Sequence, residues 1–158
     1  METFNLNAFK AIQKKLVNNN ITWVIIGSYG LMLRGLSIKP KDIDILTDMH
    51  GINFFNDNFN HNIKKNFSYS YLKNSRSLYG ELGFWGITVE IMAELENKFH
   101  NKWELHEGLS HITQIQSNSI NIPVVSVDYE LYINKNLKRY ERVKQIESFI
   151  DSKAIQVV

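Results

Sequence analysis

Cysteine is absent from this chain of 158 residues, which excludes disulfide bonds and thiolate metal sites. The absence fits a reducing compartment, and we expect a cytoplasmic protein. No apolar run approaches the roughly 20 residues that a membrane helix needs. The first residues, METFNLNAFKAIQKK, also lack the apolar core of a signal peptide. We therefore expect no membrane partner.

Net charge of either sign is also nearly absent. The chain has 18 basic and 16 acidic side chains, a net charge of +2, which is too balanced to indicate nucleic-acid binding by bulk charge. With 44% hydrophobic and 22% charged residues, the composition is typical of a globular protein with a sizeable core. We expect a single domain over residues 1–158, and the oligomeric state stays open.

The apolar spacing predicts helices and strands in a mixed order. The expected helices are residues 5–18, Ser28 to about Gly35, 50–59, and about 127–153 as two helices that meet near Asn136. The expected strands are residues 21–27, 42–48, 67–73, 77–84, 86–94 and 120–127. Three of these, 67–73, 77–84 and 86–94, are typical of an antiparallel meander, whereas residues 94–119 give no clear pattern. The expected fold class is α+β, with one mixed, mostly antiparallel sheet flanked by helices.

The segment DIDILTD, residues 42–48, places two aspartates inside an otherwise apolar strand. Residues i and i+2 of a strand point to the same face, so Asp42 and Asp44 project together while Ile43 and Ile45 project towards the core. Adjacent carboxylates repel each other, and their desolvation is costly. A divalent cation removes both penalties, and Mg²⁺ commonly binds one or two carboxylates together with substrate phosphates. The alternative is a solvated sheet face, where such pairs are common.

A third acid, Glu90, projects from the apolar strand GITVEIMAE. If this strand lies beside DIDIL in the sheet, Glu90 joins Asp42 and Asp44. Three carboxylates can hold two metal ions, which clamp the attacking and leaving oxygens of a phosphoryl displacement. On its own, such a residue is more often a solvent-facing strand residue than a metal ligand, and the metal interpretation of Glu90 depends on its combination with the other acids and with Gly27-Ser28.

Gly27 and Ser28 end the first strand and begin a short helix. Glycine lets the backbone approach a ligand closely, and the Ser28 hydroxyl with the free N–H groups of the helix start forms an anion site suited to phosphate. The simpler interpretation is a tight turn in which Ser28 caps the helix and Gly35 ends it. Arg34 and Lys41 either contact phosphate or lie on the surface.

The stretch VIIGSYGLMLRGLSIKPKDIDIL, residues 24–46, resembles the signature of the nucleotidyltransferase superfamily related to DNA polymerase beta. That signature is an apolar strand ending in Gly-Gly or Gly-Ser, a spacer, then Asp-x-Asp, with a third acid on a later strand. Gly27-Ser28, Asp42, Asp44 and Glu90 occupy those places in order. The short chain resembles the minimal nucleotidyltransferases, including relatives of antibiotic adenylyltransferases and of AbiEii-type toxins.

The resemblance implies a mechanism. Gly27, Ser28 and the helix start hold the β- and γ-phosphates of an NTP, while Asp42 and Asp44 bind Mg²⁺ and share a second ion with Glu90. Mn²⁺ can substitute for Mg²⁺. Glu90 or the second ion activates the acceptor hydroxyl, which attacks the α-phosphorus in line and displaces pyrophosphate. The NTP stays open, as does the acceptor, which is a small molecule, a tRNA or a protein.

The C-terminal segment IPVVSVDYELYINKNLKRYERVKQIESF resembles the end of the same superfamily, in which a Pro-Val strand leads to a helix with lysine and then to a basic segment. Lys135, Arg139 and Arg142 are spaced i, i+4, i+7, so on a continuous helix they share one face. They either meet a triphosphate or an acidic acceptor, or form a solvated face. Gln145 departs from the superfamily pattern, in which an acid is often found there, and this leaves the role of Lys144 open.

Two other classes compete with an enzyme. One is a non-catalytic nucleotide-binding or antitoxin-like module with the same fold, which the loss of an acid would favour, although all three acids are present. The other is a nucleic-acid-binding domain, against which the absence of a basic tract speaks.

Overall fold

A computed structural model describes residues 3–84, 86–117 and 120–155, and the side chains of 3–9, 11, 154 and 155 lie outside the description. Its centre is one eight-stranded mixed sheet. Seven of the strands follow the order β3-β4-β5-β2-β1-β8-β7, and the eighth, β6, pairs with β5. The strands are β1 (Trp23–Ile26), β2 (Ile43–Thr47), β3 (Ile63–Tyr71), β4 (Ser75–Phe84), β5 (Ile87–Phe99), β6 (Lys102–Leu105), β7 (Ile112–Ser117) and β8 (Ile120–Val125).

Most neighbouring strands are antiparallel, and the parallel pairs are β1 with β8 and β2 with β5. Strands β3, β4 and β5 form the expected meander. Because β5 returns beside β2 rather than beside β1, the centre of the sheet brings the first two strands of the chain next to the last strand of the meander. The predicted fold class is confirmed.

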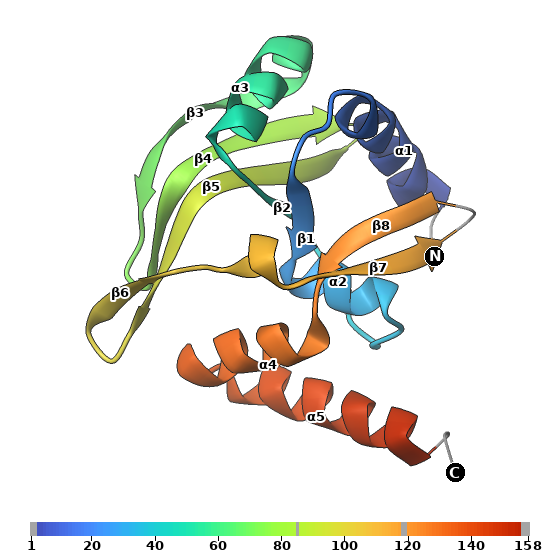
Figure 1. Ribbon diagram of the computed structural model, residues 1–158, viewed down its shortest axis with the longest axis vertical. Helices are drawn as coiled ribbons and strands as arrows, with labels where there is room; N and C mark the ends of the chain where they lie inside the picture. The colour runs from blue at the N-terminus through green and yellow to red at the C-terminus, as the bar shows by residue number, and fades with distance from the viewer. Residues whose placement is uncertain (1–2, 85, 118–119, 156–158) are drawn as a thin grey trace.

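Helices cover both faces of the sheet (Figure 1). They are α1 (Thr3–Asn18), α2 (Gly27–Leu33), α3 (Met49–Asn58), α4 (Val127–Asn136) and α5 (Tyr140–Ile155), with 3-10 turns at Asn60–Asn62 and Gly108–Ser110. The side chains of α1 and α3 join the largest apolar cluster, with Ile25, Ile45 and Ile91 of the sheet. Helix α4 packs Tyr129 and Ile133 against the other face. Among the described residues, no helix has both the length and the apolar character needed to cross a membrane.

Each predicted strand and helix has a counterpart among these elements, but the sequence did not predict β6, β7 or the extension of β5 to Phe99, which lie in the segment without a clear pattern. The two C-terminal helices are separate, since α4 ends at Asn136 and α5 begins at Tyr140. Gly35 ends α2 as expected, with φ +102° and its N–H donating to Met32 O at 2.9 Å. Among residues predicted for the first helix, Ile12 and Leu16 are fully buried, and the Phe9 side chain lies outside the described residues.

Two local predictions are wrong. Ser28 does not cap α2, because the helix begins one residue earlier at Gly27 and Ile26 occupies the capping position without a side-chain bond. Strand β2 does not have one solvated face, because Leu46 is buried against α4 in the second apolar cluster. Asp44 lies on the same face as Leu46 and therefore points towards α4 rather than into open solvent.

Phe55 has the largest side chain among the fully buried residues, and its ring packs at centroid distances of 6.3 Å from Phe54 and 5.6 Å from Phe59. We expect Phe55→Ala to lower the free energy of unfolding by about 3–5 kcal/mol, since it removes apolar contacts and leaves a cavity. Urea unfolding followed by circular dichroism measures this change. The control Tyr71→Ala, at a ring that is 72% exposed, should change the same quantity by less than about 0.5 kcal/mol; equal losses would contradict this packing.

Candidate active site

The parallel pairing of β2 with β5 places Asp44 directly beside Glu90. Their carboxyl groups share a hydrogen bond, and Asp42, half-buried at the start of β2, lies close enough to act electrostatically on both. On its other side, β2 pairs with β1, and Asp44 lies opposite Ile26, the residue before Gly27. The structure therefore brings together the three predicted acids and the glycine turn.

This cluster of acids is electrostatically costly without a cation. Burial, together with the charges of Asp42 and Glu90, raises the pKa of Asp44 to about 8. Burial also raises the pKa of Glu90, while a hydrogen bond from Tyr79 works in the opposite direction. Like charges in a half-buried site are stabilised either by a shared proton or by a positive ion.

Gly27 allows the backbone to pass close to Asp44. Its φ is +68°, a left-handed conformation that favours glycine, and a Cβ atom there would lie 3.0 Å from Asp44 Oδ2. The Gly27 N–H does not point to open space but donates to Glu130 Oε1 at 2.5 Å. Glycine at this position is thus required both by the turn and by the neighbouring carboxylate.

Glu130 is a fourth acid that the sequence analysis missed. It lies on α4, is 6% exposed, and also accepts a 3.3 Å hydrogen bond from Asn134 Nδ2. Burial raises its pKa, which the Gly27 N–H and the charges of Arg139 and Arg142 partly oppose. The sequence signal that could have identified Glu130 is helical spacing, because Glu130, Ile133 and Asn134 share the buried face of α4.

Two cavities meet at this cluster. One, of about 400 Å³, extends over the meander and is lined by Glu90, Tyr79 and Lys65 among others. The second, of about 630 Å³, lies towards α5 and is lined by Ser28, Arg142 and Gln145 among others. Both cavities are lined by Gly27, Asp44, Glu130 and Arg139. In such an arrangement, two substrate molecules can bind in separate cavities while their reacting ends meet at the same acids.

Tyr79 forms the wall of the first cavity next to Glu90. Its hydroxyl donates to Glu81 Oε1 at 2.8 Å, and burial raises the pKa of the phenol well above its ordinary value. Lys65 Nζ lies 4.7 Å from the centre of the Tyr79 ring. The sequence identified Tyr79 only as a meander residue that could face an acceptor or solvent, and the structure places it at the cavity.

The predicted basic residues do not all reach the cavities. Arg139 lines both of them, although the break between α4 and α5 means that it does not share a continuous helix with Lys135. Lys135 Nζ instead forms a 2.8 Å ion pair with Glu147. Arg34 donates to Val125 O at 2.7 Å and to Thr113, and this guanidinium ties α2 to β8 and β7. Lys41 is exposed and lines neither cavity.

The three predicted acids also form the candidate site for a divalent cation. Within residues 3–84, 86–117 and 120–155, no three acidic or histidine side chains already form a metal cage. Nevertheless, Asp42, Asp44 and Glu90 offer only carboxylate oxygens, the donors that Mg²⁺ and Mn²⁺ prefer. Burial and mutual repulsion raise the pKa of Asp44, and a positive ion would oppose both effects.

Comparison with solved structures identifies the fold. TM1012 of Thermotoga maritima, described provisionally as a nucleotidyltransferase, superimposes with a TM-score of 0.76 at 27% identity, over 94% of this chain and 93% of that one. A crystal structure of ANT(2")-Ia in complex with adenylyl-2"-tobramycin gives a TM-score of 0.63 at 12% identity, over 98% and 94% of the two chains. A solution structure of the same antibiotic-resistance factor gives 0.62 at 12% identity, over 99% and 90%. No curated protein matches the chain.

The fold is that of a nucleotidyltransferase. The family model for aminoglycoside-2''-adenylyltransferases matches residues 8–145, most of the chain. This protein therefore belongs to the aminoglycoside-2''-adenylyltransferase family, and the resemblance to antibiotic adenylyltransferases is confirmed. Family membership favours the enzyme over the non-catalytic alternative.

We expect Gly27→Ala to lower nucleotidyl transfer by at least about 10-fold, since the new methyl group needs an unfavourable φ and crowds the Asp44 carboxylate. The matched control is Gly86→Ala, because Gly86 has φ +85° but nothing within 4 Å of the place that a Cβ atom would take, so only the backbone cost remains. Steady-state kinetics on both variants separates the two effects. Equal activity of the two variants would show that contact with Asp44 is unimportant.

The buried imidazole of His106 should make the free energy of unfolding depend on pH. Burial lowers the pKa of this imidazole to about 4, and Nδ1 accepts the Gly108 N–H at 3.1 Å. In the unfolded chain, the His106 imidazole binds a proton near its ordinary pKa of about 6.5. In the folded chain, it stays neutral at that pH. The stabilisation is therefore complete above pH 6.5 and falls, by up to roughly 3 kcal/mol, as the pH drops towards 4.

We expect His106→Asn, which keeps a hydrogen-bond acceptor near Nδ1 but does not titrate, to lose less stability than the wild type between pH 7 and 5. Urea unfolding at each pH measures the difference. Since Asp44, Glu90 and Glu130 have raised pKa values and contribute the opposite trend, only the difference between variant and wild type is diagnostic. His100→Asn, at an exposed position, should follow the wild type.

Proposed function

We propose that this nucleotidyltransferase transfers a nucleoside monophosphate from an NTP to a hydroxyl group of a small-molecule acceptor, with Mg²⁺ as cofactor. The observation that carries the proposal is the position of Asp44 and Glu90, side by side where two cavities meet. ANT(2")-Ia, which shares the fold, has been crystallised with an adenylylated small molecule, adenylyl-2"-tobramycin. A small-molecule acceptor is therefore favoured over a tRNA or a protein.

Asp42, Asp44 and Glu90 would hold the cation, which would neutralise the phosphates and the developing charge. The cavity towards α5 suits the nucleotide, because Arg139 and Arg142 line it and Ser28 lies at its edge. Arginine is well suited to phosphate recognition. Lys41 and Lys135 are less suited as nucleotide ligands in this conformation, and Arg34 acts in holding α2 to the sheet.

In the transfer step, the acceptor oxygen forms a bond to the α-phosphorus while the bond from that phosphorus to the bridging oxygen breaks. Pyrophosphate leaves with the electron pair. Glu90 is the candidate that accepts the proton of the attacking hydroxyl, since it lines the cavity over the meander. Holding the two reactants in line on either side of Asp44 would supply much of the rate.

The test is label transfer from each of the four α-labelled NTPs, with Mg²⁺ and a cell extract separated into small-molecule, RNA and protein fractions. We expect label in the small-molecule fraction, and a loss of at least about 100-fold in Asp44→Asn and in Glu90→Gln. The control is Glu94→Gln, on the same strand but outside both cavities. Chelation of divalent ions should abolish the reaction, and Mn²⁺ should restore part of it.

Transfer by Asp44→Asn at the wild-type rate would exclude this mechanism. Label in the RNA or protein fraction would retain the chemistry and overturn the choice of acceptor.

A further inference from the structure

Strand β5 has acids at Glu90, Glu94 and Glu96, so that the first two are four residues apart and the last two are two residues apart. Strict alternation would place all three on one face of the sheet, where they would line the cavity beside Asp44 with a row of carboxylates. The structure interrupts this alternation. Glu94 has φ +51°, and the pairing of β5 with β4 shifts register between Arg76 and Leu78. This is a β-bulge, which re-aims the residues that follow it.

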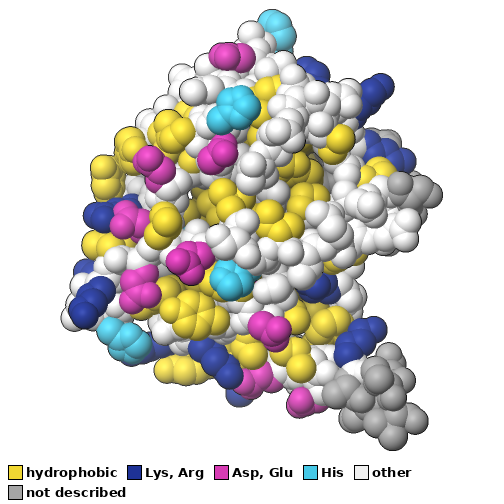
Figure 2. Space-filling view, viewed as in Figure 1, with side chains coloured by type: hydrophobic (Ala, Val, Ile, Leu, Met, Phe, Trp, Pro, Cys, Tyr) yellow, Lys and Arg dark blue, Asp and Glu magenta, His cyan; other side chains and the backbone are white. Residues whose placement is uncertain are grey.

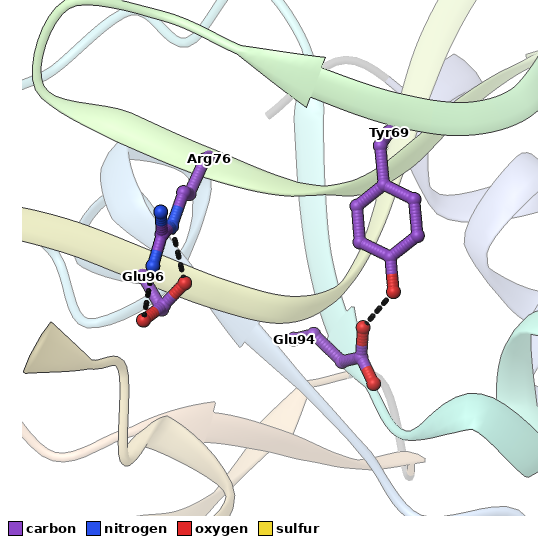
Figure 3. A network of polar contacts seen from close by, with 4 residues as sticks. All are labelled: Tyr69, Arg76, Glu94 and Glu96. Carbon is purple, nitrogen blue, oxygen red and sulfur yellow. Dashed lines mark hydrogen bonds and ion pairs between the residues drawn. The ribbon is translucent and has the colours of Figure 1, made fainter. Parts of the chain in front are cut away.

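Beyond the bulge, Leu95 and Asn97 line the cavity of about 400 Å³, whereas Glu94 and Glu96 do not. These two carboxylates are instead satisfied elsewhere, by Tyr69 and Arg76 respectively (Figure 3). Arg76 Nη2 donates to Glu96 Oε1 at 3.0 Å. The bulge therefore replaces two acids of the cavity wall by an apolar and an amide side chain.

Apart from the acids and Tyr79, the wall of this cavity combines neutral hydrogen-bonding groups with apolar side chains such as Leu72 and Leu95 and with the guanidinium of Arg76. Its wall includes Ser70, Ser75, Ser77, Asn97 and His106. Asn97 is 5% exposed, and its Nδ2 has no hydrogen-bond partner within the part of the chain that the structure describes. A buried amide nitrogen without a partner is unfavourable, and a ligand oxygen would satisfy it. Ser77, 6% exposed, adds a hydroxyl on the same wall.

The charged groups of the cavity leave little for an ammonium group to bind. The acids that line it are Asp44, Glu90 and Glu130, all at the end shared with the second cavity. Glu130 already accepts from Gly27. Lys65, Arg76 and Arg139 line the same cavity and add positive charge, although Arg76 is paired with Glu96. On the face seen in Figure 2, acidic side chains are likewise interspersed with hydrophobic, histidine and neutral groups rather than gathered in one patch.

From this wall we infer that the cavity over the meander binds the acceptor as a neutral polyhydroxylated molecule, of the class of unmodified sugars and cyclitols, and not as a polyamine. Asn97 and Ser77 hydrogen-bond its hydroxyl groups, and one further hydroxyl is presented to Glu90. The inference rests on the proposed function for its reacting end. An amino sugar would place ammonium groups against Asn97, Ser77 and the cationic Arg76, whereas the acids of the cavity are those proposed for the cation and the reaction.

Calorimetric titration without nucleotide tests the inference. The neutral probes are glucose, trehalose and myo-inositol, and the amino probes are glucosamine, 6-amino-6-deoxytrehalose and tobramycin. We expect at least one neutral probe to bind about 10-fold more tightly than every amino probe. Asn97→Asp, which restores an acid to the wall without changing its shape, should weaken that neutral probe and strengthen its amino counterpart, each by about 10-fold. Asn101→Asp adds the same charge at an exposed turn and should change neither.

Three results would overturn the inference: tighter binding of an amino probe by the wild type, no binding of any neutral probe at about 10 mM, or an unchanged preference in folded Asn97→Asp. A thermal melt establishes that the variant is folded. Because no nucleotide is present, a failure of nucleotidyl transfer leaves this measurement intact. Conversely, efficient transfer to tobramycin with tight tobramycin binding would support the proposed function and remove this inference.

Discussion

The parallel pairing of β2 with β5 is the constraint on which the rest of the site depends. Its register sets Asp44 beside Glu90, and the antiparallel pairing of β2 with β1 sets the same aspartate opposite the end of β1. A slip of one residue in either pairing would turn the carboxylates to the other face, into the cluster of Ile45, Ile91 and Phe55. The apolar residues between the acids therefore fix the positions of the acids.

That arrangement has a cost in stability. Burial raises the pKa of Asp44 to about 8, and the negative charges of Asp42, Glu90 and Glu130 add to this effect. Hydrophobic residues on both faces of the sheet offset the cost, since Val24 and Leu46 on one face and Ile25 and Ile45 on the other are at most 2% exposed. Repulsion between buried carboxylates is relieved when a cation binds, so the same repulsion that destabilises the folded protein would strengthen the proposed interaction with a divalent ion.

The strands that carry the acids could be predicted from sequence because their pattern has period two and their apolar partners are β-branched. The residues that could not be predicted depend on tertiary contacts. Glu130 becomes a site residue only because α4 packs across the sheet, and Asn97 enters the cavity only because the bulge at Glu94 breaks the alternation. The partners of two basic residues were hidden from the sequence for a related reason. Arg34 and Lys135 fit a phosphate-binding pattern, but nearby acceptors, the Val125 carbonyl and Glu147, bind them first.

The two cavities are built from different parts of the fold, and this separates two kinds of selectivity. The cavity towards α5 has walls from α2, α4 and α5, whereas the cavity over the meander has walls from β3, β4 and β5 as well as from α4. Among the described residues, only Gly27, Asp44, Glu130 and Arg139 line both. A bulge or a substitution in the meander can therefore change which acceptor is bound without moving the acids. By the same geometry, a change in Gly27 or Asp44 would affect both proposed ligands at once, because these two residues line both cavities.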